Sequence, residues 1–421
     1  MLQAASSATI QAMATNVSMR VNPDEPLFVF VGGGSGGHIA PAIVTARMLQ
    51  RAFPRSRHHF LCSTREIDRR MLQNAFGDDN TFRAEFPFDY TVRTGFFGGI
   101  RTSLQLLIDT VRSVRMLRTL NPAVVISLGA RPAIAPGLAA RLLRIPLILL
   151  EFNAVPGTAT RLLSRFADMA LTGIPISTDS TGGLRCPQKS TGVPLLCNNH
   201  DLESPALPAA EYLQRRQLLI LGGSQGASEL NQLVPAAIRS ARLLDSGWSV
   251  LHQHGEGKDA EARAAWGADV SRVTLASFLQ NPSAELACSA FVICRSGAVT
   301  LAEISNAGIP ALLLPLQNSS HSHQWRNAEW ARDSGFAELV VFSADSSGQL
   351  RQSLQALCDD EQRRLQMCTA ATAVARPSAA RAVADAISSM LKCDLERAGE
   401  SVPPLDSAVQ IDDGNSSTRK L

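Results

Sequence analysis

The stretch that decides the fold is Val31-Gly32-Gly33-Gly34-Ser35-Gly36-Gly37-His38-Ile39-Ala40-Pro41. It follows the apolar run 27–31 and precedes a helical pattern at 39–52. Glycines between a strand and a helix let the backbone approach a ligand closely, and the first N–H groups of the helix attract anions. A loop that only binds phosphate needs no titratable side chain, so His38 is unexpected. We predict a site of chemistry at this turn, with His38 as a general base.

Short apolar runs alternate with amphipathic segments along most of the chain. Strands are predicted at 27–31, 58–62, 123–128, 147–150 and 169–172, and again at 217–221, 249–253, 272–276, 291–294, 311–314 and 338–342. Helices are predicted between them, at 39–52, 66–75, 103–120, 136–144 and 157–166, and then at 227–243, 283–288, 298–307 and 323–334. This alternation predicts an α/β fold with parallel sheets covered by helices on both faces.

A second glycine-rich turn, 222–227, directly follows the strand at 217–221, so each half of the chain opens in the same way. We predict two Rossmann-like domains, with the ligand in the cleft between the carboxyl ends of their strands. The predicted segments are a disordered extension at 1–24, an N-terminal domain at 25–190, a linker at 191–216, a C-terminal domain at 217–395 and a disordered tail at 396–421.

Composition narrows the possible functions. The chain has 421 residues, 45% of them hydrophobic and 18% charged, which is typical of a globular protein long enough for two domains. A net charge of +3 does not indicate nucleic acid as a partner. No apolar run reaches the length of a transmembrane helix, and the extension at 1–24 lacks the apolar segment of a cleaved signal.

Metal chemistry is not predicted. The eight cysteines include no Cys-x-x-Cys pair, and the chain contains no Asp-x-Asp sequence of the kind that holds a divalent cation on a diphosphate. The cysteines fit buried free thiols in a reducing compartment. We therefore expect no metal and no cofactor, with helix N-termini in contact with any diphosphate.

A basic stretch marks the first half of the chain, where residues 93–165 contain ten arginines and two acidic residues. This charge suits an anionic surface such as phospholipid headgroups, and equally an ordinary solvated face. An apolar helical stripe lies within it, and we predict that the stripe packs as core against the sheet: Leu104, Leu107, Ile108, Val111, Val114 and Leu117. The preceding Phe96-Phe97 segment is the better candidate for contact with lipid.

Other polar positions stand at predicted strand ends or helix starts. Thr300 and Glu303 lie one turn apart after the strand at 291–294; a carboxylate there can accept hydrogen bonds from a ribose diol, although the same spacing fits a capping box. Gln324 and Asn327 share a helical face and suit sugar hydroxyls, or form a polar surface turn. Glu151-Phe152-Asn153 ends an apolar strand and points toward the cleft.

Five segments together resemble the MurG family of peptidoglycan N-acetylglucosaminyltransferases, which have two Rossmann domains (the GT-B fold). The resemblance covers about 28–383. Its segments, in the family's order, are 33–38 with Pro41, 151–153, 222–227 with Asn231, 294–298 with Thr300 and Glu303, and Gln324 with 327–328.

The resemblance implies an inverting transfer of N-acetylglucosamine from UDP-GlcNAc to the C4 hydroxyl of undecaprenyl-diphosphoryl-N-acetylmuramoyl-pentapeptide. It implies a peripheral location at the cytoplasmic face of the bacterial inner membrane, on an anionic surface. Glu303 would bind the ribose, Ser224 the diphosphate, and Gln324, Asn327 and Asn153 the sugar. The other implied donor contacts are Ser35, Gly36, Gly37, Gln225, Gly226, Arg295, Ser296, Gly297, Ala298 and Thr300. The implied acceptor contacts are Gly33, Gly34, Gly129, Arg131 and Glu151.

The chain departs from the family pattern at four places. Gly129-Ala130-Arg131 replaces a Gly-Gly-Tyr turn, Leu196 replaces an arginine, Asn281-Pro282 replaces Asp-Met, and Phe152 replaces a glutamine. These departures leave two alternatives open. One is a related transferase with a different lipid or small-molecule acceptor, and the other is a non-catalytic protein that binds the nucleotide sugar.

Overall fold

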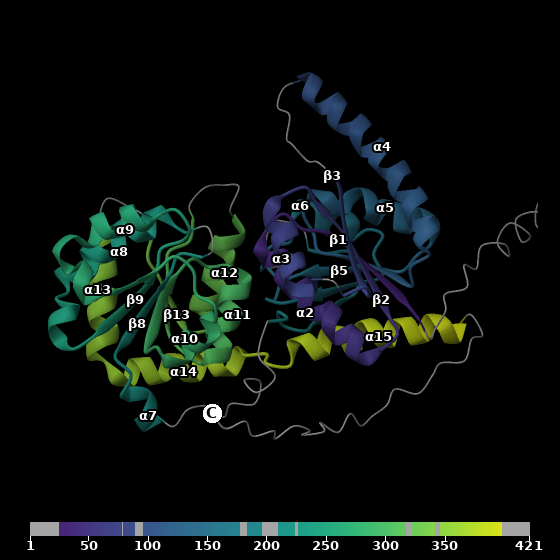
Figure 1. Ribbon diagram of the computed structural model, residues 1–421. Coiled ribbons are helices and arrows are strands. Elements are labelled where there is room, and N and C mark those ends of the chain that lie inside the picture. Colours follow the sequence, from purple (N-terminus) through teal and green to yellow (C-terminus); the bar gives the residue numbers. More distant parts are fainter. Residues whose placement is uncertain are drawn as a thin grey trace, which may run out of the picture.

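The computed structural model describes residues 25–77, 79–88, 96–176, 183–195, 209–223, 226–316, 322–341 and 346–397. Two α/β lobes face one another in it (Figure 1). Among the described residues, no helix combines the length and the apolar character that crossing a membrane requires. The predicted fold class is confirmed, with two parallel sheets flanked by helices.

The N-terminal domain is built on a seven-stranded parallel sheet. In order across the sheet, the strands are β3 (Phe82–Phe88), β2 (Arg57–Ser63), β1 (Leu27–Gly32), β4 (Val124–Ser127), β5 (Leu147–Glu151), β6 (Met169–Thr172) and β7 (Gln188–Ser190). Side chains of β1 alternate between its two faces, as a strand buried on both sides requires. Phe28 and Phe30 enter one core and Val29 and Val31 the other.

Helices cover both faces of this sheet. They are α2 (Gly36–Ala52), α3 (Glu66–Phe76), α4 (Phe96–Leu120), α5 (Ile134–Leu143) and α6 (Thr158–Leu163), with a short 3-10 turn at Arg131–Ala133. The predicted strands and helices of this half are confirmed. Two strands were not predicted: β7, which has three exposed residues, and β3. Its side chains are mostly half-buried or exposed, so the apolar run that marks a central strand is missing.

The C-terminal domain repeats the arrangement with six parallel strands. Their order is β10 (Thr274–Ala276), β9 (Ser249–Gln253), β8 (Gln217–Leu221), β11 (Phe291–Cys294), β12 (Ala311–Leu313) and β13 (Ala337–Leu339). The helices are α7 (Ala209–Leu213), α8 (Ser228–Ser240), α9 (Asp259–Trp266), α10 (Pro282–Cys288), α11 (Ala298–Ala307), α12 (Ser322–Asp333), α13 (Ser346–Asp359) and α14 (Glu361–Val374), with 3-10 turns at Leu243–Ser246 and Gly267–Arg272.

The strand order fixes where a ligand can bind. In each sheet the chain moves outward from the first strand in one direction and then returns to continue on the other side, so neighbouring crossovers diverge between β1 and β4 and between β8 and β11. A crevice forms at such a switch point, at the carboxyl ends of the strands. The turn after β1 and the turn after β8 are the two glycine-rich segments, so both lie at switch points.

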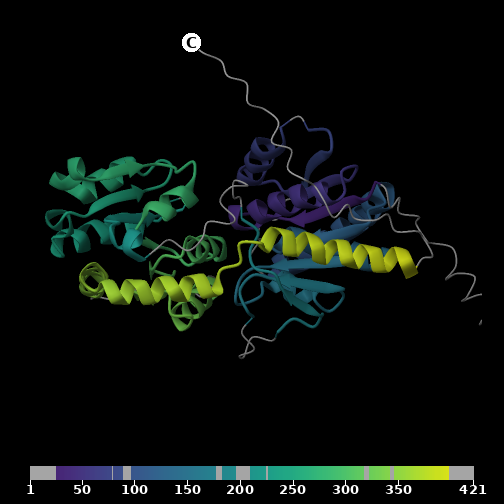
Figure 2. The same cartoon turned by 90° about the horizontal axis from the view of Figure 1, so that it is seen from below.

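The last described helix returns to the first domain. Helix α15 (Ala379–Arg397) packs against α2 of the N-terminal domain, and its Val383 and Ile387 are fully buried. Figure 2 shows α14 and α15 running along one side of both lobes. The predicted C-terminal domain, 217–395, therefore includes a helix that packs on the other domain. Five helices of this half were not predicted: α7, α9, α13, α14 and α15.

Helix α4 departs from the prediction for its apolar stripe. Leu104, Leu107, Ile108 and Val111 are 57%, 62%, 51% and 45% exposed, so the prediction that they form core is wrong. The prediction holds at the other end of the stripe, where Leu117 is fully buried in the core and Val114 packs against it. Asp109 and Ser113, outside the stripe, are also buried. The first half of α4 projects from the domain (Figure 1), which leaves the stripe without a partner. The Phe96-Phe97 segment lies in the first turn of α4, and its side chains lie outside the described residues.

Candidate functional site

The first glycine turn places His38 in the first turn of α2. Ser35 precedes the helix, and its hydroxyl lies 2.7 Å from His38 Nδ1, so the second ring nitrogen, Nε2, is the one left for a substrate. The ring is half-buried. Burial lowers the pKa of His38, although the charges of Glu151 and Asp68 raise it and that of His323 lowers it. A histidine with a lowered pKa is neutral near pH 7 and can accept a proton.

Glu151 organises the loop that follows β5. One carboxylate oxygen accepts hydrogen bonds from the backbone N–H of Asn153 (3.2 Å) and from its side-chain amide (3.1 Å). The other oxygen accepts the N–H of Gly157 at 3.0 Å. The predicted contact of Glu151 with the acceptor stays a prediction, since this carboxylate is 5% exposed and already holds the loop in shape.

The same loop is held from the other domain by α12. Asn327 accepts the Ala154 N–H on its Oδ1 at 2.9 Å and donates from Nδ2 to Asn153 Oδ1 and to the Ser296 carbonyl, both at 3.1 Å. Its side chain is fully buried. Sugar binding by Asn327 and Asn153 stays a prediction; in the structure these two amides join the domains.

His323 makes a further contact between the domains. Its Nδ1 lies 2.8 Å from the carbonyl oxygen of Val155. A carbonyl oxygen only accepts, so Nδ1 carries a proton and donates this bond. His323 is also close enough to His38 for its charge to act on that ring. The two histidines therefore come to the cleft from opposite domains.

The second glycine turn is fixed by a chain of buried hydrogen bonds. Trp266 Nε1 donates to His252 Nδ1 (3.0 Å), His252 Nε2 donates to Asn231 Oδ1 (3.0 Å), and Asn231 Nδ2 donates to the His254 carbonyl (3.1 Å). Gly226 lies against that carbonyl, and a Cβ there would stand 2.2 Å from the oxygen. The turn is thus held close to the end of β9. Ser224 and Gln225 lie outside the described residues.

The turn after β11 carries the remaining predicted donor residues. Arg295 donates to the Leu314 carbonyl (2.6 Å) and pairs with Glu229 (2.8 Å), so its guanidinium is held by protein groups. Ser296 donates its hydroxyl to the Gln324 carbonyl at 2.6 Å. Gln324 in turn accepts the Leu316 N–H on its side chain at 3.2 Å. These bonds connect the starts of α11 and α12.

Glu303 differs from these neighbours. No hydrogen bond or ion pair to its carboxylate is found within the described ranges, and burial alone raises its pKa to about 7. It lies on α11, one turn after Thr300. The helix begins at Ala298, directly after Gly297. A desolvated carboxylate without a partner is suited to accept the two hydroxyls of a ribose.

The turn after β4 contains a strained residue. Ala130 has φ 58° and ψ 169°, a conformation that is almost confined to glycine. Gly129 before it donates its N–H to the Ser127 hydroxyl at 3.2 Å, and Arg131 after it is exposed. A Cβ on Gly32 would stand 2.5 Å from the Gly129 carbonyl, so this turn and the first glycine turn are in contact.

Comparison with known proteins assigns the chain to a family. The model of the glycosyltransferase family 28 N-terminal domain matches residues 28–172, and that of the C-terminal domain matches residues 217–387. The chain belongs to glycosyltransferase family 28. A family member from Xanthomonas campestris pv. campestris is 35% identical over 369 residues, which cover 85% of this chain and 81% of the relative. It is named UDP-N-acetylglucosamine--N-acetylmuramyl-(pentapeptide) pyrophosphoryl-undecaprenol N-acetylglucosamine transferase.

Two further relatives extend this family assignment. A protein of the same name from Ectopseudomonas mendocina is 33% identical, with 85% of this chain and 96% of the relative covered. The crystal structure of Acinetobacter baumannii MurG superposes with a TM-score of 0.70 at 26% identity, over 87% of this chain and 100% of that one. The MurG resemblance of the sequence motifs is therefore confirmed, and the protein is a glycosyltransferase of the family 28 type.

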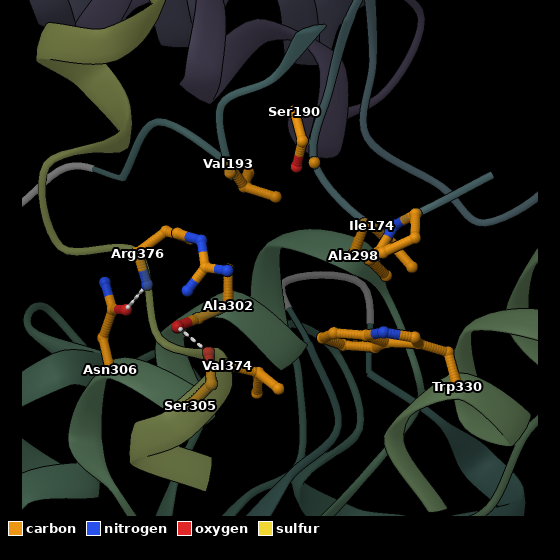
Figure 3. Close-up of a pocket in the computed structure, with 13 residues that line it drawn as sticks. Ile174, Ser190, Val193, Ala298, Ala302, Ser305, Asn306, Trp330, Val374 and Arg376 are labelled. Carbon is orange, nitrogen blue, oxygen red and sulfur yellow. Dashed lines mark hydrogen bonds between the residues drawn. The ribbon is translucent and has the colours of Figure 1, made fainter. Parts of the chain in front are cut away.

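A small pocket lies at the domain junction, lined mostly by residues that were not predicted as site residues. It measures about 90 Å³ and lies between Ile174 and Val193 of the first domain and Ala302 and Trp330 of the second (Figure 3). Of the predicted site residues only Ala298 lines it. Pockets that bind small-molecule ligands usually enclose roughly 300 Å³ or more, so this pocket is small for such a ligand. The glycine turns lie elsewhere in the cleft.

Two residues that the sequence did not single out contact segments of this candidate site. Asp68 lies in α3, after the strand next to β1, and hydrogen-bonds to the first glycine turn. His323 stands four residues before Asn327, and this spacing places both on one face of α12. Both residues could have been noticed in the sequence. Asp68 is an acidic residue soon after the second strand, and His323 lies four residues before Asn327 in the same predicted helix.

Proposed function

We propose that this chain transfers N-acetylglucosamine from UDP-GlcNAc to the C4 hydroxyl of undecaprenyl-diphosphoryl-N-acetylmuramoyl-pentapeptide, with inversion at the anomeric carbon. The names of the family relatives support this donor and this acceptor. The observation that carries the chemistry is the position of His38. Its Nδ1 is held by Ser35, and it lies in a cleft that Glu151 and His323 approach from the two domains.

The reaction needs one proton transfer and one displacement. The acceptor hydroxyl loses its proton to His38 Nε2 while its oxygen forms a bond to C1 of the sugar. The bond from C1 to the diphosphate oxygen breaks on the opposite side, and UDP leaves with that electron pair. Backbone N–H groups at the start of α8 and α11 are positioned to stabilise the charge that develops on the diphosphate. We propose that this charge is balanced without a metal ion.

Donor recognition falls to the second domain. We infer that Glu303 accepts the ribose hydroxyls, because it is desolvated and has no protein partner within the described part of the chain. Gln324 and the Gly226 turn border the sugar and the diphosphate. The Asn327 link positions the loop at Asn153 from the other domain, so closure of the cleft and formation of the sugar site are coupled.

Membrane contact is proposed for α4. Four exposed apolar residues lie on one face of this helix, and Arg112, Arg115 and Arg118 are exposed nearby. A helix with an apolar stripe and a basic flank binds the surface of an anionic bilayer. The acceptor is anchored in the membrane by its polyprenyl chain, so a peripheral location at the cytoplasmic face of the inner membrane brings enzyme and substrate together.

The proposal is tested by transfer of radiolabelled N-acetylglucosamine. The full chain is assayed with the muramoyl lipid and with a polyprenyl diphosphate that carries another sugar. We expect product with the muramoyl lipid only. Product with the other lipid alone would establish a different acceptor, and UDP-GlcNAc binding without product from any acceptor would establish a binding protein.

His38→Gln tests the catalytic assignment in the same assay. We expect kcat to fall by a factor of about 10² to 10⁴, the usual contribution of general base catalysis, with UDP affinity retained. Turnover close to that of the unmodified chain would remove His38 from the mechanism. Asn74→Ala, an exposed position on α3, is the control and should keep full activity.

A further inference from the structure

Asp68 is a fully buried carboxylate beside the first glycine turn. It lies in the first turn of α3, and its two oxygens accept the Gly34 N–H at 3.0 and 2.7 Å. The Ser63 hydroxyl donates to Oδ2 at 2.7 Å. Within the described ranges, no lysine, arginine or histidine forms an ion pair with it. Three hydrogen bonds therefore hold this buried carboxylate, which has no ion pair in the part of the chain that the structure describes.

The carboxylate and the glycine turn fit one another closely. Gly33 has φ +115°, and a Cβ built on it would stand 2.5 Å from Asp68 Oδ2. The Gly34 N–H, which a phosphate could otherwise take, is already bound by Asp68. An internal anion thus occupies this part of the turn, and a second anion at the same amide would be repelled. The turn is better suited at this point to a neutral hydroxyl than to a phosphate.

The charge of Asp68 acts on His38. Four groups face the imidazole or its turn: Asp68 from α3, Glu151 from the end of β5, His323 from α12, and Arg65, which donates to the Gly34 carbonyl at 2.7 Å. A negative charge nearby favours the imidazolium form, so Asp68 raises the pKa of His38 against the lowering by burial. Burial has the largest effect on this pKa, and Glu151 opposes it more strongly than Asp68 does, so Asp68 is the second of two carboxylates that favour protonation of His38.

We propose that Asp68 is the positioning residue of the catalytic centre: its buried carboxylate clamps the first glycine turn through Gly34, just before His38, and brings a negative charge to the turn that carries this histidine. The inference rests on the proposed role of His38 as the base. Asp68 does not touch the substrate and acts only through the turn and the imidazole. A purely structural role would require the clamp but not the charge.

The test separates the clamp from the charge. Asp68→Asn keeps an oxygen that can accept the Gly34 N–H and removes the charge, and Asp68→Ser is a second neutral variant if the first fails to fold. Asp168→Asn is the matched control, because Asp168 also accepts a backbone N–H, that of Leu147 at 2.8 Å, at the opposite end of the sheet. For each full-length variant, the His38 pKa is measured by NMR titration of labelled histidine and the pH profile of kcat/KM by transfer assay.

We expect Asp68→Asn to lower the His38 pKa, because the variant removes a negative charge that raises it. The acid limb of the kcat/KM profile should move to lower pH by the same amount, and kcat should fall on the plateau. Asp168→Asn should change neither. An unchanged His38 pKa in a folded Asp68 variant would overturn the inference. Loss of the His38 role itself appears separately, as full turnover by His38→Gln.

Discussion

Asn327 and Asn153 lie 174 positions apart in the chain, and their side-chain amides are joined across the cleft by a 3.1 Å hydrogen bond. Asn327 also accepts the Ala154 N–H and donates to the Ser296 carbonyl. Its three hydrogen bonds thus connect the loop after β5 in the first domain with α12 and the start of α11 in the second. The side chain is fully buried, and nothing else described replaces these contacts.

Replacing Asn327 with alanine should therefore weaken both folding and donor binding. The Ala154 N–H and the Ser296 carbonyl would be left buried without partners, at about 1–3 kcal/mol for each such group. We expect the free energy of unfolding to fall by about 2 kcal/mol or more and KM for UDP-GlcNAc to rise, measured by urea denaturation and transfer kinetics. Asn74→Ala should stay within about 0.5 kcal/mol of the unmodified chain. Unchanged stability and KM would show that the link is dispensable.

Glu303 should make ribose binding depend on pH. Burial raises its pKa to about 7, so below that pH the group is mostly a neutral acid, and only the carboxylate accepts both ribose hydroxyls. Affinity should therefore rise with pH, by about tenfold between roughly pH 6 and 8, as one proton is released on binding. Uridine is the probe, since it lacks the phosphates that titrate in this range.

Two comparisons make the Glu303 prediction specific. Glu303→Gln should bind uridine weakly and with no pH dependence, and 2′-deoxyuridine should bind the unmodified chain weakly because it lacks one of the hydroxyls. Calorimetry gives both the affinity and the number of protons released. A pH dependence that survives in Glu303→Gln would place the titrating group elsewhere.

The stripe on α4 should bind anionic vesicles. Leu107→Glu puts a charge in the centre of the most exposed apolar face, and the loss of one buried leucine, about 1.5–3 kcal/mol, corresponds to a tenfold or greater loss of partitioning. Thr119→Glu makes the same change of charge at the far end of the helix and should have a smaller effect. Co-sedimentation with vesicles at low and at high salt separates the contribution of the apolar side chain from that of the charge. Equal losses in the two variants would mean that charge alone governs binding.

Ala130 should be improved by glycine. Its φ of 58° and ψ of 169° cost an alanine about 1–3 kcal/mol, while glycine loses about 0.5–1 kcal/mol more conformational entropy on folding. Ala130→Gly should therefore stabilise the chain by about 1 kcal/mol. Ala264→Gly, on an exposed face of α9, should instead destabilise it by roughly 0.5–1 kcal/mol. Denaturant unfolding of both variants checks the opposite signs, and the same sign for both would contradict the strain at Ala130.

The central strands could be predicted from the sequence because both sheets are buried on two faces. Continuous apolar runs such as Leu27–Gly32 and Phe291–Cys294 have few other interpretations. The strand β3 was missed because its exposed residues Arg83, Ala84 and Glu85 interrupt that pattern. The α4 stripe shows a different limit: periodicity identifies residues that share a face, but burial depends on whether another element covers that face.

The site was harder to predict than the fold. The sequence placed Ser35, His38, Glu303 and Asn327 near the cleft by their positions at strand and helix ends. It did not give their partners, because these come from distant segments: Asn327 meets Asn153, and His323 meets Val155, 168 residues away. A polar residue predicted to bind a sugar and one that joins two domains have the same local pattern.

Two glycines of the second glycine turn have similar backbone angles but differ in how closely other atoms approach them. Gly223 and Gly226 have φ of +76° and +66°, so an alanine at either position pays the same backbone penalty, about 1–2 kcal/mol. A Cβ on Gly223 would have no atom of the described residues within 4 Å, whereas one on Gly226 would stand 2.2 Å from the His254 carbonyl oxygen. The His254 carbonyl belongs to the backbone and accepts a hydrogen bond from Asn231, so it cannot move aside as a flexible side chain would.

Gly226→Ala should therefore cost clearly more than Gly223→Ala. We expect the Gly223 variant to lose about 1–2 kcal/mol of unfolding free energy, and the Gly226 variant to lose more and to separate the turn from the end of β9. Urea denaturation gives the free energies, and the fluorescence of Trp266, which belongs to the same hydrogen-bonded chain, reports the displaced turn. If the two variants lose the same free energy, the close approach of Gly226 to His254 does not hold the donor turn in place.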